Sequence, residues 1–221
     1  MNSEPNAKVE FIVPENCNKI WFVVLGAPSV YNSHAWDENE SNDDQWPYKI
    51  IFEGTDILGN ITIDPNASPK DITLTYNLSI PADANTYSGI EINMTENRDI
   101  YEIAQAFVMQ PAEMVGIMLD PKQHPQENKI AFASIESDGR HNYDTTANGY
   151  GFWFNKSGDV VGWGSESFIF SEFTHSDFTF FIGQYPNKCK KGDKFTIKEA
   201  LIYTKNDKQY KAIFQFNITI T

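Results

Sequence analysis

The sequence predicts a mainly β fold, an antiparallel β-sandwich-like domain interrupted by a short two-helix insertion. Three observations favour this class. The chain has 221 residues, 41% of them apolar, which is enough to bury a real core. Its branched aliphatic residues outnumber Leu, and 14% of its residues are aromatic, a composition typical of strands. Apolar and polar residues also alternate between turn-forming residues along most of the chain.

Residues 1–63 are expected to form an N-terminal β segment. Its predicted strands are Lys8–Val13, Lys19–Leu25, Tyr48–Glu53 and Asn60–Ile63. So small a segment cannot bury a good core alone, and we therefore expect it to pack on the rest of the chain. Its strands faintly resemble those at the C-terminal end, which leaves open a partial internal repeat.

The stretch from residue 64 to residue 71 is polar and contains prolines, so we interpret it as a linker. It is expected to lead into a second domain, residues 72–221. This domain is expected to begin with the strands Ile72–Ile80 and Ile90–Met94, because both alternate apolar with polar residues.

The two-helix insertion is expected at about residues 99–119. Asp99 is predicted to be the N-cap of the first helix, with Glu102 three residues later completing a capping box. The second helix is predicted to begin at Pro111, because proline is favoured at the first helical position.

Strands are expected to resume after the helices. They are Lys129–Ile135, Tyr150–Phe154, Val160–Trp163, Ser167–Phe170, Phe178–Ile182, Lys194–Tyr203 and Gln209–Thr219. The hairpin from Phe152 to Val160 is the clearest local signal. Because hairpin-length loops join most neighbouring strands, we expect antiparallel pairing.

The formal net charge of −13 disfavours functions that need a basic surface. It repels nucleic acid backbones and anionic membrane surfaces, so no nucleic acid partner is expected. The longest apolar run, Ile20–Leu25, is far too short to span a membrane, and no direct membrane insertion is expected. The only basic cluster is interpreted as a solvated loop and comprises Lys188, Lys190, Lys191 and Lys194.

Two features leave alternatives open. Cys17 and Cys189 are the only cysteines, and they could form one disulfide or remain two ordinary thiols. The chain also starts without the basic and apolar segments of a signal peptide. A cytoplasmic protein is expected to start in this way, and so is an exported protein whose signal has been removed.

The sequence contains no recognisable catalytic motif. Nucleophile elbows, phosphate-binding loops, His-Glu-x-x-His and Cys-x-x-Cys patterns are all absent. The histidines are far apart in polar loops, which gives no support to a zinc site; they are His34, His124, His141 and His175. We therefore expect a protein that is not an enzyme and has no cofactor, unless it binds calcium.

One acidic loop places oxygen-bearing side chains at alternate positions, as hard calcium ligands would be placed. The candidate ligands are Asp37, Asn39, Ser41 and Asp43. An EF-hand loop would have Gly and Glu where this chain has Asn42 and Tyr48. Two interpretations remain open, a calcium site that rigidifies the loop and a solvated negative loop.

Aromatic side chains bracket the same loop at an unusual density. They include Tyr31, Trp36, Trp46 and Tyr48. Flat aromatic faces stack on the apolar faces of sugars, so these residues are candidates for glycan binding. A second candidate surface comprises Tyr150, Trp153 and Trp163, because strand alternation places Trp153 on the face opposite to Phe152. Core packing is the alternative interpretation of the tryptophans.

Several motifs of the chain resemble one known family. They are Asn18–Pro28, Gln45–Tyr48, Gly149–Phe154, Trp163–Gly164, Phe170–Phe173, Ile182–Pro186, Cys189–Lys198 and Ala200–Tyr203. Together they resemble the Bacteroidetes family called domain of unknown function 4859. The likeness covers most of residues 71–221 and is strongest over residues 149–221. It implies a secreted or surface-located accessory domain, and it implies no reaction and no catalytic residue.

These observations predict a non-catalytic accessory module that binds polysaccharide or glycan by aromatic stacking. The module is expected to be extracellular, either secreted or on the outer cell surface. The expected ligand-binding residues are Trp36, Trp46, Tyr48, Tyr31 and Trp163. Other domains of a larger chain are the expected protein partners. The alternative is a structural or protein-interaction module that assembles a larger cell-surface protein, which the small N-terminal segment and its faint repeat favour.

Overall fold

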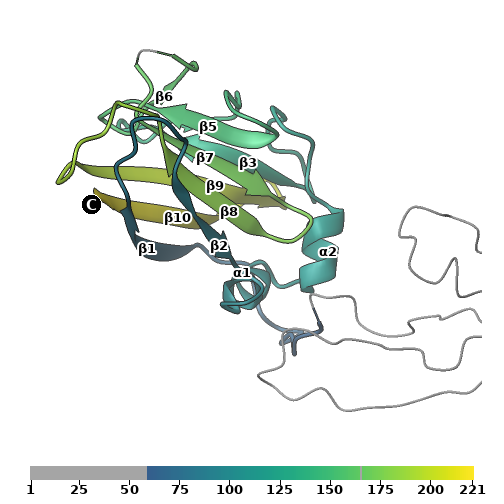
Figure 1. Ribbon diagram of the computed structural model, residues 1–221. Coiled ribbons are helices and arrows are strands. Elements are labelled where there is room, and N and C mark those ends of the chain that lie inside the picture. The colour runs from purple at the N-terminus through teal and green to yellow at the C-terminus, as the bar shows by residue number, and fades with distance from the viewer. Residues whose placement is uncertain (1–58, 165) are drawn as a thin grey trace, which may run out of the picture. The chain divides into compact units, whose positions relative to one another are not determined.

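The computed structural model describes residues 59–164 and 166–221, which form two packed β-sheets with two short helices beside them (Figure 1). All described residues belong to the unit Thr55–Thr221. The elements in chain order are β1 (Ile72–Ile80), β2 (Gly89–Asn93), α1 (Asp99–Phe107), α2 (Pro111–Gly116), β3 (Ile130–Ile135), β4 (His141–Asn142), β5 (Tyr150–Phe154), β6 (Val160–Val161), β7 (Ile169–Thr174), β8 (Thr179–Gln184), β9 (Lys194–Lys205) and β10 (Lys208–Ile220).

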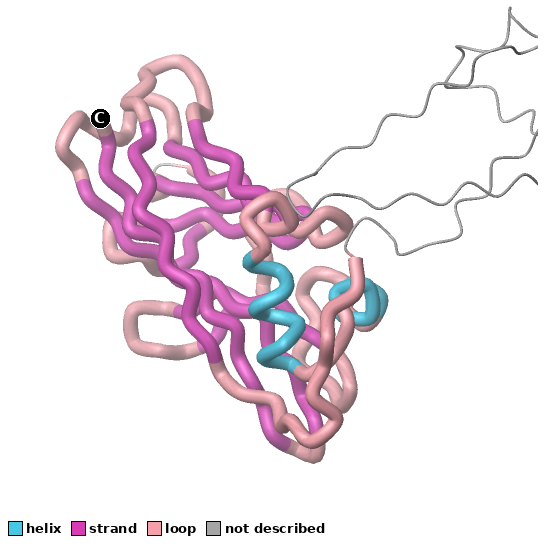
Figure 2. The backbone as a smooth tube through the Cα atoms, turned by 90° about the horizontal axis from the view of Figure 1, so that it is seen from below, coloured by secondary structure: helices cyan, strands magenta, loops and turns pink. Residues whose placement is uncertain are grey.

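Each sheet contains five strands. The first sheet has the order β1-β10-β9-β3-β4 and the second the order β2-β8-β7-β5-β6. The helices follow β2 and lie at one end of the sheets (Figure 2). The predicted class, a mainly β sandwich with a two-helix insertion, is therefore confirmed.

One strand pairing differs from the antiparallel arrangement expected throughout. β1 runs parallel to β10, with Ile72 opposite Ala212 and Ile80 opposite Ile220. The expectation was wrong here because the two strands are far apart in the sequence, so no hairpin fixes their relative direction. All other pairings between the described strands are antiparallel.

The core lies between the two sheets and consists largely of aromatic rings. Strand alternation directs these rings inward: Phe152 and Phe154 of β5 are fully buried, as their spacing predicts. The ring of Phe132 stacks on that of Phe173 at 5.1 Å, which joins the two sheets. Burial of each such side chain stabilises the fold by about 1.5–3 kcal/mol.

A carboxyl group also lies in this core. Glu199 of β9 is fully buried, and one of its oxygens accepts a 2.5 Å hydrogen bond from the hydroxyl of Ser171 on β7. Its other oxygen has no hydrogen-bond partner. Burial raises the pKa of Glu199 to about 8, because water no longer solvates the ionised form.

Helix α1 begins at the residue that was expected to cap it, one residue earlier than predicted. Asp99 is the first helical residue, the N-cap is Arg98 in a left-handed conformation, and no side chain caps this end. The predicted capping box of Asp99 and Glu102 is therefore wrong. The reason is that the carboxylate of Asp99 accepts a 2.7 Å hydrogen bond from the hydroxyl of Tyr76 on β1.

The capping box lies instead on α2, where Gln110 is the N-cap and Glu113 its partner. The start of α2 at Pro111 is confirmed. The Gln110 amide also accepts from the Ile61 N–H and donates to the Ile61 carbonyl, each at 2.9 Å. The predicted strand Asn60–Ile63 is absent, because this side chain satisfies the backbone groups that a neighbouring strand would otherwise pair.

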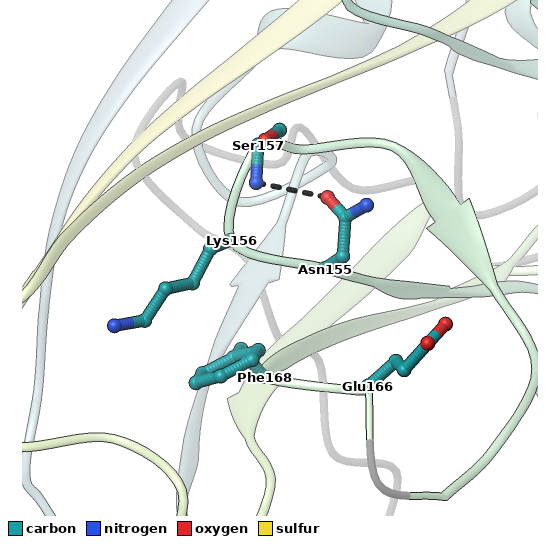
Figure 3. A pocket seen from close by; sticks show the side chains of 5 residues that line it. All are labelled: Asn155, Lys156, Ser157, Glu166 and Phe168. Atoms are coloured by element: carbon teal, nitrogen blue, oxygen red, sulfur yellow. Dashed lines mark hydrogen bonds between the residues drawn. The ribbon is translucent and has the colours of Figure 1, made fainter.

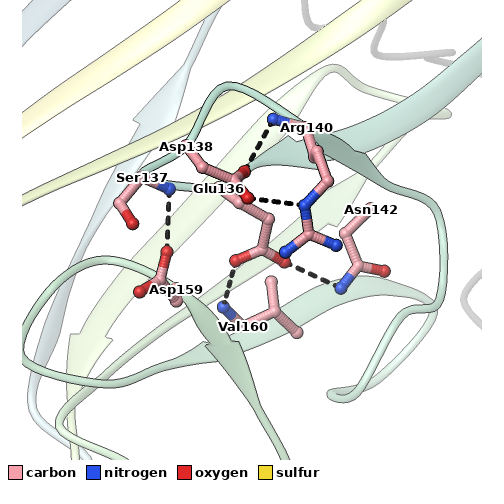
Figure 4. Close-up of polar contacts among 7 residues, drawn as sticks. All are labelled: Glu136, Ser137, Asp138, Arg140, Asn142, Asp159 and Val160. Carbon is pink, nitrogen blue, oxygen red and sulfur yellow. Dashed lines mark hydrogen bonds and ion pairs between the residues drawn. The ribbon is translucent and has the colours of Figure 1, made fainter.

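Polar contacts join two hairpin turns, one from each sheet (Figure 4). Glu136, after β3, accepts hydrogen bonds from the side chain of Asn142 at 2.8 Å and from the backbone N–H of Val160 at 2.9 Å. Asp159 accepts from the backbone N–H of Ser137 at 2.7 Å. These contacts fix the β5–β6 turn against the first sheet.

Other predicted boundaries shift by a few residues. β6 is shorter than the predicted Val160–Trp163, so Trp163 lies in the following loop, and the short strand β4 had no clear sequence signal. The predicted strands Lys8–Val13, Lys19–Leu25 and Tyr48–Glu53 lie outside the described residues. In the part of the chain that the structure describes, no helix has the length and apolarity needed to cross a membrane.

Candidate functional site

The outer face of the second sheet carries an apolar row that crosses all five strands. The strand registers place these residues side by side in the order Val161, Trp153, Phe170, Gly183 and Gly89. The row would be unremarkable on an inner face, but this face points away from the core. Trp153 and Phe170 are nevertheless only 8% and 4% exposed, so other side chains must cover them.

Two paired glycines make room for this aromatic layer. A Cβ atom on Gly183 would lie 2.4 Å from the ring of Phe170, and one on Gly89 would lie 2.8 Å from the ring of Phe181. Because real Cβ contacts are longer, neither position tolerates a side chain without movement. The glycines therefore let the two rings lie close to the backbone of β2 and β8.

Three aromatic residues from different loops form a second layer over the first. Tyr87 precedes β2, Tyr185 follows β8, and Trp163 follows β6. The ring of Tyr87 lies 6.0 Å from that of Trp153 and 5.6 Å from that of Tyr185. The ring of Trp163 lies 6.3 Å from that of Tyr185. We call Trp163, Tyr87 and Tyr185 the aromatic platform.

The platform presents its aromatic surface to solvent. Trp163 is 66% exposed and Tyr87 is 44% exposed, and they are the only large hydrophobic residues exposed in residues 59–164 and 166–221. The indole N–H of Trp163 donates to the hydroxyl of Tyr87 at 3.4 Å. Burial and the neighbouring Tyr87 hydroxyl raise the pKa of Tyr185, so its phenol stays neutral at physiological pH.

The loop that carries Tyr87 is held rigidly. The side chain of Asp83 accepts hydrogen bonds from the backbone N–H groups of Asn85 and Thr86. The amide of Gln184 donates to the carbonyls of Asp83 and Thr86, at 3.1 and 2.8 Å. Because Gln184 lies at the end of β8, these bonds fix the Tyr87 loop directly to the sheet.

The Trp163 loop is held by Ser167. Its hydroxyl donates to the carbonyl of Gly162 at 2.8 Å and accepts from the N–H of Gly164 at 3.1 Å. These two glycines flank Trp163, and each has open space where a Cβ would stand. The indole is thus placed on a closed turn with no bulky neighbours beside it in the sequence.

Polar groups border the aromatic layer on the neighbouring row of the sheet. Glu172 and Glu91 lie on either side of Phe181 in the strand register. Glu172 accepts a 3.0 Å hydrogen bond from the side chain of Asn148. Their carboxylates can accept hydrogen bonds from ligand hydroxyl groups that lie beyond the aromatic rings.

A shallow surface depression of about 390 Å³ is lined by Asn155, Lys156, Ser157, Glu166 and Phe168 (Figure 3). The ammonium group of Lys156 lies 5.2 Å from the centroid of the Phe168 ring, within the range of a cation–π interaction. In Figure 3 the side chains of Lys156 and Glu166 extend in opposite directions, with Phe168 between them.

The structure brings together only part of the second candidate surface expected from the sequence. Trp163 and Trp153 belong to the same aromatic cluster. Tyr150, by contrast, is buried on the inner face, against Phe132 and Phe173, because strand alternation opposes it to Trp153.

Tyr87 and Tyr185 were missed by the sequence interpretation. The signal that could have found them is their spacing: each lies two residues from a strand glycine, Gly89 or Gly183, and these glycines pair across the strands. The other predicted ligand-binding residues lie outside the described residues, and their role stays a prediction; they are Tyr31, Trp36, Trp46 and Tyr48.

The predicted calcium ligands, Asp37, Asn39, Ser41 and Asp43, also lie outside the described residues. Within residues 59–164 and 166–221, no group of three or more His, Cys, Asp or Glu side chains is placed to hold a metal ion. Cys189 is a buried free thiol, and burial, aided by Asp193, raises its pKa to about 11. Cys17 lies outside the described part of the chain.

Two family models match the chain, over different segments. The model described as Domain of unknown function (DUF4859) matches residues 86–209, which include the whole aromatic platform. The model described as Family of unknown function (DUF6055) matches residues 1–59. The motifs Asn18–Pro28 and Gln45–Tyr48 therefore lie outside the first match, and assigning them to that family was wrong. The comparisons with curated proteins and with solved structures found no match.

The match to residues 86–209 extends from the Tyr87 loop to the start of β10 and spans more than half of the chain. It includes both helices and all five strands of the second sheet. The chain thus belongs to the family described as Domain of unknown function (DUF4859).

Proposed function

We propose that the domain formed by the described residues is a non-catalytic glycan-binding module and that the aromatic platform is its binding site. The observation that carries this proposal is the exposure of Trp163 and Tyr87, side by side, on a rigid aromatic layer. Large aromatic side chains with this much solvent contact are unusual in a folded domain unless they meet a ligand or partner.

The chemistry of the platform suits sugars. An aromatic face offers a large apolar surface at a low cost in conformational entropy, and it can cover the C–H face of a pyranose ring. The indole N–H, the two phenol hydroxyls and the nearby carboxylates of Glu91 and Glu172 offer hydrogen bonds to sugar hydroxyls.

The rigidity of the platform supports a binding role. The Tyr87 loop is tied to β8 through Gln184, and the Trp163 loop is closed by Ser167. A site that is already ordered loses less conformational entropy when a ligand binds. The ring planes are not parallel, since those of Trp163 and Tyr185 meet at 46°. This geometry fits a single glycan chain better than a flat crystalline surface.

The proposal includes a location and a context. A module that binds polysaccharide is useful outside the cell, so we expect the parent chain to be secreted or displayed on the outer cell surface. The family resemblance noted above supports the same expectation. Protease digestion of intact producing cells, followed by detection of the chain, tests it: an exposed chain is degraded, whereas a chain inside the cell survives.

Native affinity gels test the binding proposal. The whole chain is run through gels that contain plant, host and microbial polysaccharides, beside Trp163→Ala and Tyr87→Ala. Tyr101→Ala on α1 is the control, because it removes a tyrosine distant from the platform in the fold. We expect one polysaccharide class to retard the wild type and the control, with at least a tenfold loss of affinity in Trp163→Ala.

The alternative function, a protein-interaction or assembly module, predicts a different pattern. No polysaccharide would retard the chain, and a partner chain or a second copy would bind in a way that depends on Trp163. Retardation that is equal in the wild type and in Trp163→Ala would also contradict the proposal, because the glycan site would then lie elsewhere.

A further inference from the structure

We infer that the glycan bound at the aromatic platform is an anionic polysaccharide, whose carboxylate or sulfate groups pair with lysines beside the platform. The inference rests on the proposed function, because it assigns the ligand class of the same site. The lysines that carry it are Lys156, Lys190, Lys191 and Lys194, which we call the lysine cluster.

Lys190, Lys191 and Lys194 are close together in the sequence, and the fold brings Lys156 near them. Three of the lysines lie in or just after the loop between β8 and β9, whereas Lys156 lies in the turn between β5 and β6. Phe168 connects the two segments: its ring lies under the Lys156 ammonium at 5.2 Å, and its carbonyl accepts from the thiol of Cys189 at 3.3 Å. Cys189 directly precedes Lys190.

The same Phe168 connects the lysine cluster to the platform. Its carbonyl also accepts a 2.8 Å hydrogen bond from the backbone N–H of Tyr185, one of the three platform residues. Trp163 lies five residues before Phe168 on the same loop. The loops that carry Tyr87, Trp163 and the lysines gather at the end of the sandwich that holds the C terminus (Figure 1).

The depression lined by Lys156 and Phe168 also carries neutral polar groups. Asn155 and Ser157 line it together with Lys156 and Phe168. The Asn155 carboxamide oxygen accepts hydrogen bonds from the N–H groups of Ser157 and Asp159, while its NH₂ group and the Ser157 hydroxyl have no hydrogen-bond partner among the described residues.

Among the described residues, no carboxylate forms an ion pair with a lysine of the cluster. Asp193 accepts a 2.9 Å hydrogen bond from the N–H of Lys190, and Asp83 accepts from two N–H groups of its own turn. Glu166 extends away from Lys156 (Figure 3). Within the described residues, the four lysines of the cluster thus offer ammonium groups that form no ion pair, in a chain of net charge −13.

Binding of a charged glycan depends mainly on the charges close to the site, because salt screens the more distant charges of the chain. At an ionic strength of about 0.1 M, exposed charges more than about 10 Å apart interact little. The acidic surface elsewhere therefore disfavours polyanions only weakly, while the lysine cluster acts at contact distance. It gives a specificity that the platform alone would lack, since aromatic faces do not distinguish charged from neutral sugars.

The test compares two forms of one polymer. Polygalacturonate and its fully methyl-esterified form share a backbone and differ in charge. Dextran sulfate, compared with neutral dextran, tests sulfate in place of carboxylate. Affinities are measured for the whole chain by isothermal titration calorimetry. The variants are Lys156→Gln/Lys190→Gln/Lys191→Gln, Trp163→Ala and, as a matched control, Lys129→Gln/Lys205→Gln/Lys208→Gln, which changes three lysines at the far end of β9.

We expect the wild type to bind an anionic polymer, carboxylated or sulfated, more tightly than its neutral counterpart. The lysine-cluster variant should lose about tenfold in affinity, because it removes three exposed charge pairs. The control triple variant should bind as the wild type does. Trp163→Ala should lose binding to every polymer.

Other outcomes separate the inference from the proposed function. Equal binding of charged and neutral polymers, unaffected by the lysine-cluster variant but lost in Trp163→Ala, would overturn the anionic ligand class and leave the glycan site standing. Binding that depends on the lysines and survives in Trp163→Ala would overturn both, because the ligand would then not stack on the platform. Absence of binding to any polysaccharide would also overturn both.

Discussion

Glu199 is a carboxyl group enclosed between two sheets, with one hydrogen bond, from Ser171, and one unpartnered oxygen. Its pKa is raised to about 8 by burial, from an ordinary value of 4.5. The folded state therefore holds this proton more tightly than the unfolded state does. The resulting stabilisation is fully present below about pH 4.5, declines as the pH rises and is lost above about pH 8.

We predict that Glu199→Gln removes this pH dependence. Because the amide stays neutral, the variant should gain stability relative to the wild type as the pH rises, by up to about 4 kcal/mol between about pH 5 and pH 9. Urea unfolding at about pH 5, 7 and 9 measures the difference. Glu172→Gln on the outer face is the control, and parallel curves for wild type and Glu199→Gln would contradict the prediction.

At the scale of elements, the pairing of β2 with β8 depends on glycine. A Cβ on Gly89 would lie 2.6 Å from the carbonyl oxygen of Ile182 and 2.9 Å from the Cα of Gly183. These are backbone atoms of the partner strand, so they cannot move aside as a side chain could.

We predict that Gly89→Ala destabilises the domain by about 1–3 kcal/mol and weakens glycan binding, because β2 must shift and Tyr87 shifts with it. Gly162→Ala is the control, since nothing lies within 4 Å of its added Cβ, and its stability should stay within about 0.5 kcal/mol of the wild type. Chemical denaturation measures both. Equal stability of the two variants would show that the β2–β8 contact is looser than described.

The segment before β1 depends on Gln110, whose amide both donates to and accepts from the backbone of Ile61. We predict that Gln110→Ala costs about 1–3 kcal/mol of stability and exposes the Ile61 amide to solvent. Hydrogen exchange should show fast exchange at Ile61 in Gln110→Ala. Gln110→Glu keeps an acceptor for the Ile61 N–H, so it should be less affected, and unchanged protection in Gln110→Ala would contradict this account.

Elements were predictable from the sequence where local pattern decides them. The alternation Phe152, Trp153, Phe154 correctly gave the inner and outer faces of β5, and Pro111 correctly gave the start of α2. Where a contact with a distant strand overrides a local pattern, the sequence was misleading. Asp99 and Glu102 have the spacing of a capping box, yet the Asp99 carboxylate accepts a hydrogen bond from the Tyr76 hydroxyl instead. That contact depends on β1, which is distant in the chain.

At the scale of the whole molecule, the platform could not be predicted because three loops form it. Trp163 was a candidate from the sequence as part of the second candidate surface, with Tyr150 and Trp153. Tyr87 and Tyr185 join it only because β2 pairs with β8 and β8 with β7, and no local pattern specifies this order. The same holds for Lys156, which joins the other lysines through contacts of Phe168.

The charge of the whole molecule was also a poor guide to its parts. A net charge of −13 indicates which partners are disfavoured on average. The net charge does not show that the fold brings lysines of the β5–β6 turn and of the β8–β9 loop to the same end of the sandwich as the exposed Trp163. The anionic ligand class follows from this arrangement and not from composition.

The central claim is that Trp163 meets the ligand, and NMR of the tryptophan indoles tests it most directly. The chain has five tryptophans, so a ¹⁵N-labelled sample gives one indole N–H signal for each, and Trp163→Phe identifies that of Trp163. On titration with the polysaccharide that retards the chain in affinity gels, we predict that the Trp163 signal shifts most, with a smaller shift of Trp153, whose ring contacts Tyr87 and Tyr185. An unchanged Trp163 signal, with the shifts confined to Trp36 or Trp46, would contradict the claim and place the site in the N-terminal segment.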